Sequence, residues 1–200
     1  IRRGEIAFLR DENYNTGRRL HECFLGDRGW TSGFFRLNGR LYQPGDLGRV
    51  IGSEIGIQIE RPDRPGGVLF DNMTALDNLC TSLIPKAGQH IIRKKIVSSI
   101  LSEALRWFPK EMLLQPLSSW SYPERLRFSY YRWYLLNPRL LICFFPFAGQ
   151  ESTHHKMIID LLVLCAQRGM AVWIISSGID AICEKTDNEE FLRRLHYLNK

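Results

Sequence analysis

Few features of this sequence assign it a chemistry directly. Its five cysteines form no CxxC pair, and an odd count is typical of reduced cytosolic thiols. No apolar run approaches the roughly 18 residues of a membrane span, and no signal peptide is visible. The sequence has no GxSxG elbow, and the adjacent His154 and His155 have no evident thiol or carboxylate partner. We therefore expect a cytoplasmic protein without a membrane span, a metal site or a serine-hydrolase pair.

The composition is that of an ordinary globular chain. Its 200 residues can bury one substantial core, and 44% are hydrophobic and 24% charged. A net charge of +6 is compatible with an anionic partner, but the charges are dispersed. The aromatic run at 130–134 could stack on bases. Because its rings fall at helical spacing, we interpret them as core and expect no nucleic-acid partner. The first residue is Ile1 rather than Met, so we expect a piece of a longer protein.

The stretch 117–149 predicts a helix that leads into a buried strand. Apolar and aromatic residues recur at helical spacing over 122–136, and Asn137-Pro138 ends the helix because the residue before proline avoids the helical conformation. Residues 140–145 then form a run without polar alternation, as in a parallel strand covered on both faces. Helix, turn and buried strand in this order indicate the centre of an α/β domain.

The remaining periodicities place further elements along the chain. Alternating residues around Asn38-Gly39 predict a hairpin over 30–42 with a type I′ turn. Asp187-x-x-Glu190 predicts a capping box that opens a helix over 187–198. We also expect strands at 5–9, 54–60 and 170–177, and helices at 18–25, 44–52, 74–83, 91–108 and 154–167.

Several segments resemble the ABC-type ATP-binding cassettes. Residues 120–149 read WSYPERLRFSYYRWYLLNPRLLICFFPFAG, which is similar to the signature helix and Walker B strand of that family, LSGGQQQ(K/R)xxxARxLxxxPxxLILDEPTxG. The matching positions are Ser121, Arg127, Arg132, Leu135, Pro138, Leu141, Ile142, Pro146 and Gly149. The hairpin resembles the family's TSGxIxLNG, and GMAVWIISS at 169–177 resembles GMAVIVISS. Residues 60–79 resemble the EDRxxxGLxxxxSVxENL segment of the second cassette of monosaccharide-import ATPases.

This resemblance implies a P-loop NTPase-like α/β fold. It has a mostly parallel sheet, a small antiparallel hairpin region and a helical subdomain at about 72–137. We expect the cassette over 1–187, and the helix at 188–200 departs from the family pattern, which has further strands there.

The phosphate-binding loop of the family, GxxGxGK(S/T), keeps only one glycine here. Its glycines let backbone amides surround phosphates, its lysine meets the β- and γ-oxygens, and its hydroxyl holds Mg²⁺. The corresponding positions are Asn15, Thr16, Gly17, Arg18 and Arg19. In an ungapped alignment, Gly17 falls at the lysine position and Arg18 at the hydroxyl position. If the alignment is shifted by one residue, Arg18 falls at the lysine position and Arg19 at the hydroxyl position. Asp11 and Glu12 add negative charge nearby, which disfavours a triphosphate.

The other reactive positions of the family are also replaced. In the degenerate signature, Ser121 and Glu124 flank Tyr122-Pro123, which occupies the place of Gly-Gly, and Pro123 has no N–H. The Walker B Asp-Glu pair becomes Phe144-Phe145. The D-loop aspartate becomes Glu151, and the switch residue becomes Gly178.

The resemblance leads to one main hypothesis for function and two alternatives. We expect a catalytically inactive cassette without a cofactor, acting as a structural or regulatory partner in a sugar-type transport system. Its partner would be another cassette or a membrane subunit, at the inner face of the membrane. Interface candidates are Glu60, Arg61, Asp63 and Arg64. The alternatives are a divergent ATPase that binds ATP and Mg²⁺ and energises sugar import, and a cytosolic regulatory module that binds another ligand or protein.

Overall fold

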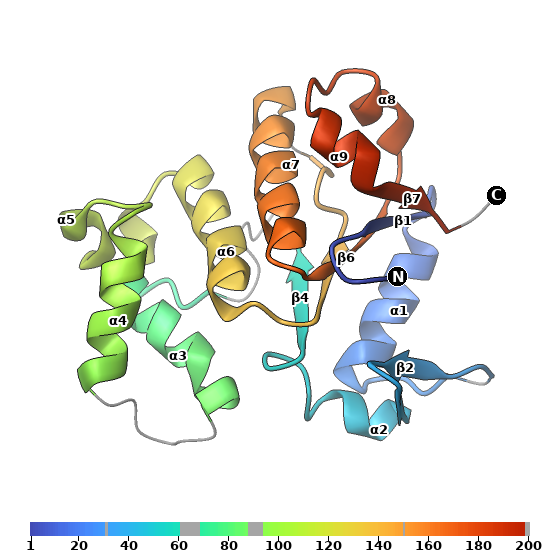
Figure 1. The fold of residues 1–200 in the computed structure, drawn as a ribbon, viewed down its shortest axis with the longest axis horizontal. Coiled ribbons are helices and arrows are strands. Elements are labelled where there is room, and N and C mark those ends of the chain that lie inside the picture. Colours follow the sequence, from blue (N-terminus) through green and yellow to red (C-terminus); the bar gives the residue numbers. More distant parts are fainter. Residues whose placement is uncertain (31, 61–68, 88–93, 150, 199–200) are drawn as a thin grey trace.

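The computed structural model describes residues 1–30, 32–60, 69–87, 94–149 and 151–198 (Figure 1). Its centre is a five-stranded sheet, parallel throughout, in the order β4-β5-β6-β1-β7. These strands are β4 (Ile55–Ile59), β5 (Leu140–Phe144), β6 (Ala171–Ser176), β1 (Ile6–Arg10) and β7 (Leu195–Tyr197). The antiparallel strands β2 (Phe35–Leu37) and β3 (Arg40–Tyr42) form a separate hairpin. The predicted α/β fold with a mostly parallel sheet is confirmed.

Helices cover both faces of the sheet and extend to one side of it (Figure 1). They are α1 (Asn15–Leu25), α2 (Pro44–Leu47), α3 (Ala75–Ala87), α4 (Lys94–Ala104), α5 (Lys110–Leu113), α6 (Tyr122–Leu136), α7 (Ser152–Gln167), α8 (Ile179–Cys183) and α9 (Glu189–Arg194), with a 3₁₀ turn at Leu117–Ser119. Helix α6 has the predicted bounds, whereas α1 begins three residues before the predicted start. No helix in the described ranges is long and apolar enough to cross a bilayer.

The side chains of the sheet divide between two cores. One face contributes Phe8, Cys143 and Ile174 to a core shared with α7, and the other contributes Ile142, Phe144 and Ile175 to a core shared with α1 and the hairpin. This division explains the unbroken apolar run of β5, since its five residues are buried on both faces.

A third core lies beside the sheet and is rich in aromatic residues. Helices α3 to α6 bury Phe108, Trp120, Phe128 and Tyr131 there, and their rings meet edge-on or tilted at centroid separations of 5.3–5.8 Å. Figure 1 shows these helices grouped at the end of the molecule away from β1 and β7. These helices lie within the range of about 72–137 where we predicted a helical subdomain, and that division of the chain remains a prediction.

The hairpin turn follows from its Asn-Gly sequence. Asn38 and Gly39 have φ values of 51° and 79°, which a type I′ turn requires at both central residues. Asparagine and glycine tolerate this left-handed conformation better than other residues, so the prediction of the turn is confirmed.

The end of the chain differs from the predicted helix over 187–198. Helix α9 ends at Arg194, and β7 then pairs in parallel with β1. The N-cap is Asn188, whose Oδ1 accepts from the Phe191 amide, so Asp187 does not open a capping box. Extended backbone is favoured because it adds a strand to the edge of β1, where the Leu198 amide donates to the carbonyl of Phe8 at 2.9 Å. The cassette boundary at residue 187 remains a prediction.

Candidate functional site

The candidate site lies where β1 leads into α1, at the carboxyl edge of the parallel sheet. Ligands of open α/β sheets bind at this edge, and the first amides of a helix attract anions. Strand β1 ends at Arg10 and α1 begins at Asn15, so only four residues connect them. Tyr14 precedes the helix in the left-handed conformation, with φ 57°. The connection is therefore shorter than the polar loop predicted over 10–17.

An internal carboxylate already occupies the amides at the start of α1. Asp11 Oδ2 accepts from the Gly17 amide at 2.6 Å, and Oδ1 accepts from the Thr16 amide at 3.3 Å. Asp11 is only 5% exposed, and its own amide donates to the carbonyl of Ser176. The carboxylate thus takes the place that an external anion would take at this helix terminus.

An aromatic ring fills the space beside the same helix terminus. A Cβ built on Gly17 would lie 2.5 Å from Cζ of Phe145, so the ring packs directly against this glycine. Phe145 has a φ of 54°, a conformation that bulky residues rarely adopt and that turns the chain sharply after β5. Gly17 is needed here because of this close approach.

Further rings surround Phe145 and its neighbour. The Tyr14 ring centroid lies 4.9 Å from that of Phe145, and the His21 ring meets Phe144 edge-on at 5.2 Å. Phe144 is fully buried, facing the core between the sheet and α1. The end of β5 therefore meets α1 through an aromatic contact and presents no carboxylate there.

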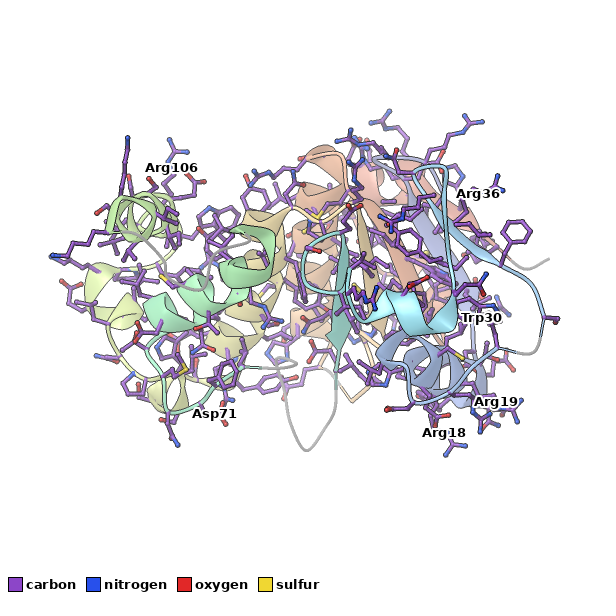
Figure 2. The ribbon with its side chains drawn as sticks, turned by 90° about the horizontal axis from the view of Figure 1, so that it is seen from below. Arg18, Arg19, Trp30, Arg36, Asp71 and Arg106 are labelled. Atoms are coloured by element: carbon purple, nitrogen blue, oxygen red, sulfur yellow. The ribbon has the colours of Figure 1, made fainter. Side chains whose placement is uncertain are left out.

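The two arginines proposed as phosphate contacts lie on the outside of α1. Both side chains are exposed, and Nε of Arg18 is 4.0 Å from a carboxylate oxygen of Glu22. Figure 2 shows Arg18 and Arg19 projecting from the surface of α1. The structure therefore does not bring them together with Thr16, Gly17 and Phe145.

The degenerate signature forms a self-contained helix cap. Ser121 is the N-cap of α6, and Glu124 Oε2 accepts from its amide at 2.8 Å and from its hydroxyl at 2.6 Å. Tyr122 and Pro123 form the first turn, and the Tyr122 ring lies 5.4 Å from that of His154. The first turn of α6 thus already has a negative charge at its start.

The D-loop and switch positions begin the two helices that follow β5 and β6. Glu151 is the exposed N-cap of α7, and Gly178 is the N-cap of α8 with φ 67°. No heavy atom lies within 4 Å of a Cβ built on Gly178, so the position is open.

Of the four interface candidates, only Glu60 lies in the described residues, and the expectation that it faces a partner is wrong. Glu60 is 3% exposed and accepts from Gln58 Nε2 at 2.7 Å. Its backbone amide donates to the carbonyl of Phe144, which fixes it beside the end of β5. Arg61, Asp63 and Arg64 lie outside the described residues.

A buried polar network that sequence reasoning missed joins β4 to α6. Gln58 Nε2 donates to Glu60 and to Ser129 Oγ, and Gln58 Oε1 accepts from Trp133 Nε1 at 2.8 Å. Next to it, burial lowers the pKa of Arg132 to about 10, and its guanidinium lies 4.6 Å from the centroid of the Trp133 ring. The only sequence signal was a single glutamine in an apolar strand.

The described residues contain no group of three or more His, Cys, Asp or Glu side chains suited to a metal ion. Near the start of α1, Asp11 is engaged by two backbone amides, and Phe144 and Phe145 carry no oxygen ligand. The geometry therefore provides a closed helix terminus at the carboxyl edge of a parallel sheet.

The fold is that of an ATP-binding cassette. The chain superimposes on cbiO1 of Clostridium perfringens, part of the ABC transporter complex cbiONQ, with a TM-score of 0.71 and 20% identity over 98% of this chain and 74% of that one. It also superimposes on a dimeric cassette in a post-hydrolysis state with ADP and Pi, with a TM-score of 0.67 and 17% identity over 98% and 82% of the two chains.

In sequence, the chain is homologous to ATP-binding proteins of sugar import. It is 24% identical over 190 residues to a protein of Pseudomonas syringae pv. tomato described as a ribose/galactose/methyl galactoside import ATP-binding protein, and 27% identical over 187 residues to one of Pseudomonas fluorescens so described. The matches cover 94% and 92% of this chain but 36% of each relative, so the chain spans about a third of their length. No family model matches the chain.

Proposed function

We propose that this chain is a cassette that has lost ATP hydrolysis and acts as a structural or regulatory partner in a sugar-type transport system. The observation that carries the proposal is the closure of the α1 terminus by Asp11 and Phe145. The Asp11 carboxylate accepts from the amides of Thr16 and Gly17, and the Phe145 ring lies against Gly17. A triphosphate could reach these amides only after both side chains moved.

The residues at the site do not fit Mg-ATP. Binding of the metal in such scaffolds takes a hydroxyl at the start of the helix and an acidic residue at the end of the adjacent strand. Here Arg18 or Arg19 stands at the hydroxyl position and Phe144 at the acidic one. Asp11 supplies negative charge, but it lies where the phosphates would be and would repel them in this poorly hydrated region.

The loss of hydrolysis also follows from the number of missing groups. Phosphoryl transfer to water needs positioned phosphates, a neutralising metal and a group that orients the water. The positions for the metal and for the base hold Phe144 and Phe145, and Gly178 offers no side chain at the switch position. One missing group of this kind costs several kcal/mol of transition-state stabilisation, and here several are missing together.

We propose that the partner is another cassette or a membrane subunit of a transporter. A cassette that keeps its fold and lacks its reactive groups can still complete an interface. The names of the relatives support a role in sugar import. Because the chain spans about a third of those relatives, the remainder of the protein or a second chain would supply the active cassette. The protein would then lie at the inner face of the membrane.

The alternative of a divergent ATPase is less well supported. It uses Arg18 or Arg19 as the phosphate cation, and both side chains extend from the outer surface of α1 (Figure 2). A cytosolic regulatory module that binds another ligand or protein remains the other alternative, and it is compatible with the same closed terminus.

Phosphate release by the purified 200-residue chain tests the loss of hydrolysis. We expect no release above background from this chain alone, with a hydrolysing cassette as the positive control. Affinity purification from the native host should recover a second cassette or a membrane subunit. Turnover that is abolished by Arg18→Ala or Arg19→Ala would instead support the divergent ATPase.

A further inference from the structure

We draw no further inference here: the strongest candidate, the apolar hollow of about 260 Å³ that Trp30, Phe34 and Trp173 line between α1, the β2–β3 hairpin and β6, carries no proposal because nothing in the described part of the structure shows what covers it.

Discussion

Removing the Asp11 carboxylate should destabilise the protein, because this group satisfies two backbone amides at the start of α1. Its hydrogen bonds to Gly17 and Thr16 are 2.6 and 3.3 Å long, and the group is 5% exposed. Loss of a capping side chain costs about 0.5–2 kcal/mol, and hydrogen bonds to charged groups contribute about 1.5–3 kcal/mol. For Asp11→Ala we therefore expect a loss of about 2 kcal/mol, or about 4–8 °C in Tm for a chain of this size.

The assay is guanidinium unfolding of Asp11→Ala beside two other variants. Asp11→Asn keeps one acceptor oxygen and should fall between Asp11→Ala and the original chain. Glu12→Ala is the control on the same loop, because among the described residues the exposed Glu12 pairs only with Arg10, at 3.8 Å. Its loss should change stability by less than about 0.5 kcal/mol. Equal stability of Asp11→Ala and Glu12→Ala would refute the role of Asp11 as an internal anion.

Three further predictions concern the site, the network and the end of the chain. The Phe145→Glu variant should release no more phosphate from ATP than the original chain does, because the groups that would bind the metal and the phosphates are still missing. Measurable turnover by this variant would contradict the prediction. Gln58→Leu should lower the free energy of unfolding by about 2–3 kcal/mol, because it leaves the buried Trp133 N–H without an acceptor. The exposed Gln115→Leu should have little effect, and equal losses would argue against the network. Two arginines lower the pKa of Glu190 from 4.5 to about 2, so Glu190→Gln should reduce Tm at pH 7, with the difference shrinking as pH falls from 4.5 to 2. A difference independent of pH would contradict that assignment.

Much of the fold could be predicted because its signals are local. The bounds of α6 follow from apolar spacing and Asn137-Pro138, and the hairpin turn follows from Asn38-Gly39, whose φ values are both positive. The buried character of β5 follows from its unbroken apolar run. Each of these features depends on residues within a few positions of one another, so periodicity and turn chemistry are sufficient.

The features that the sequence did not reveal depend on contacts between distant segments or on the path of a short loop. In the sequence, Asp11 is only one of the acidic residues in a polar loop. Its role as the acceptor for the amides of α1 depends on a four-residue connection that turns its carboxylate toward Gly17. Likewise, Glu60 was predicted on an interface, but Gln58 and the end of β5 hold it inside. The C-terminal part of the helix predicted over 187–198 is instead strand β7, because the backbone there pairs with the edge of strand β1.

Calorimetric titration of the purified protein with Mg-ATP tests the central claim most directly. If Asp11 and Phe145 close the start of α1, the titration should show no binding in the micromolar range, and any residual affinity should be millimolar. Stoichiometric binding with a micromolar Kd that is lost without Mg²⁺ would contradict the account.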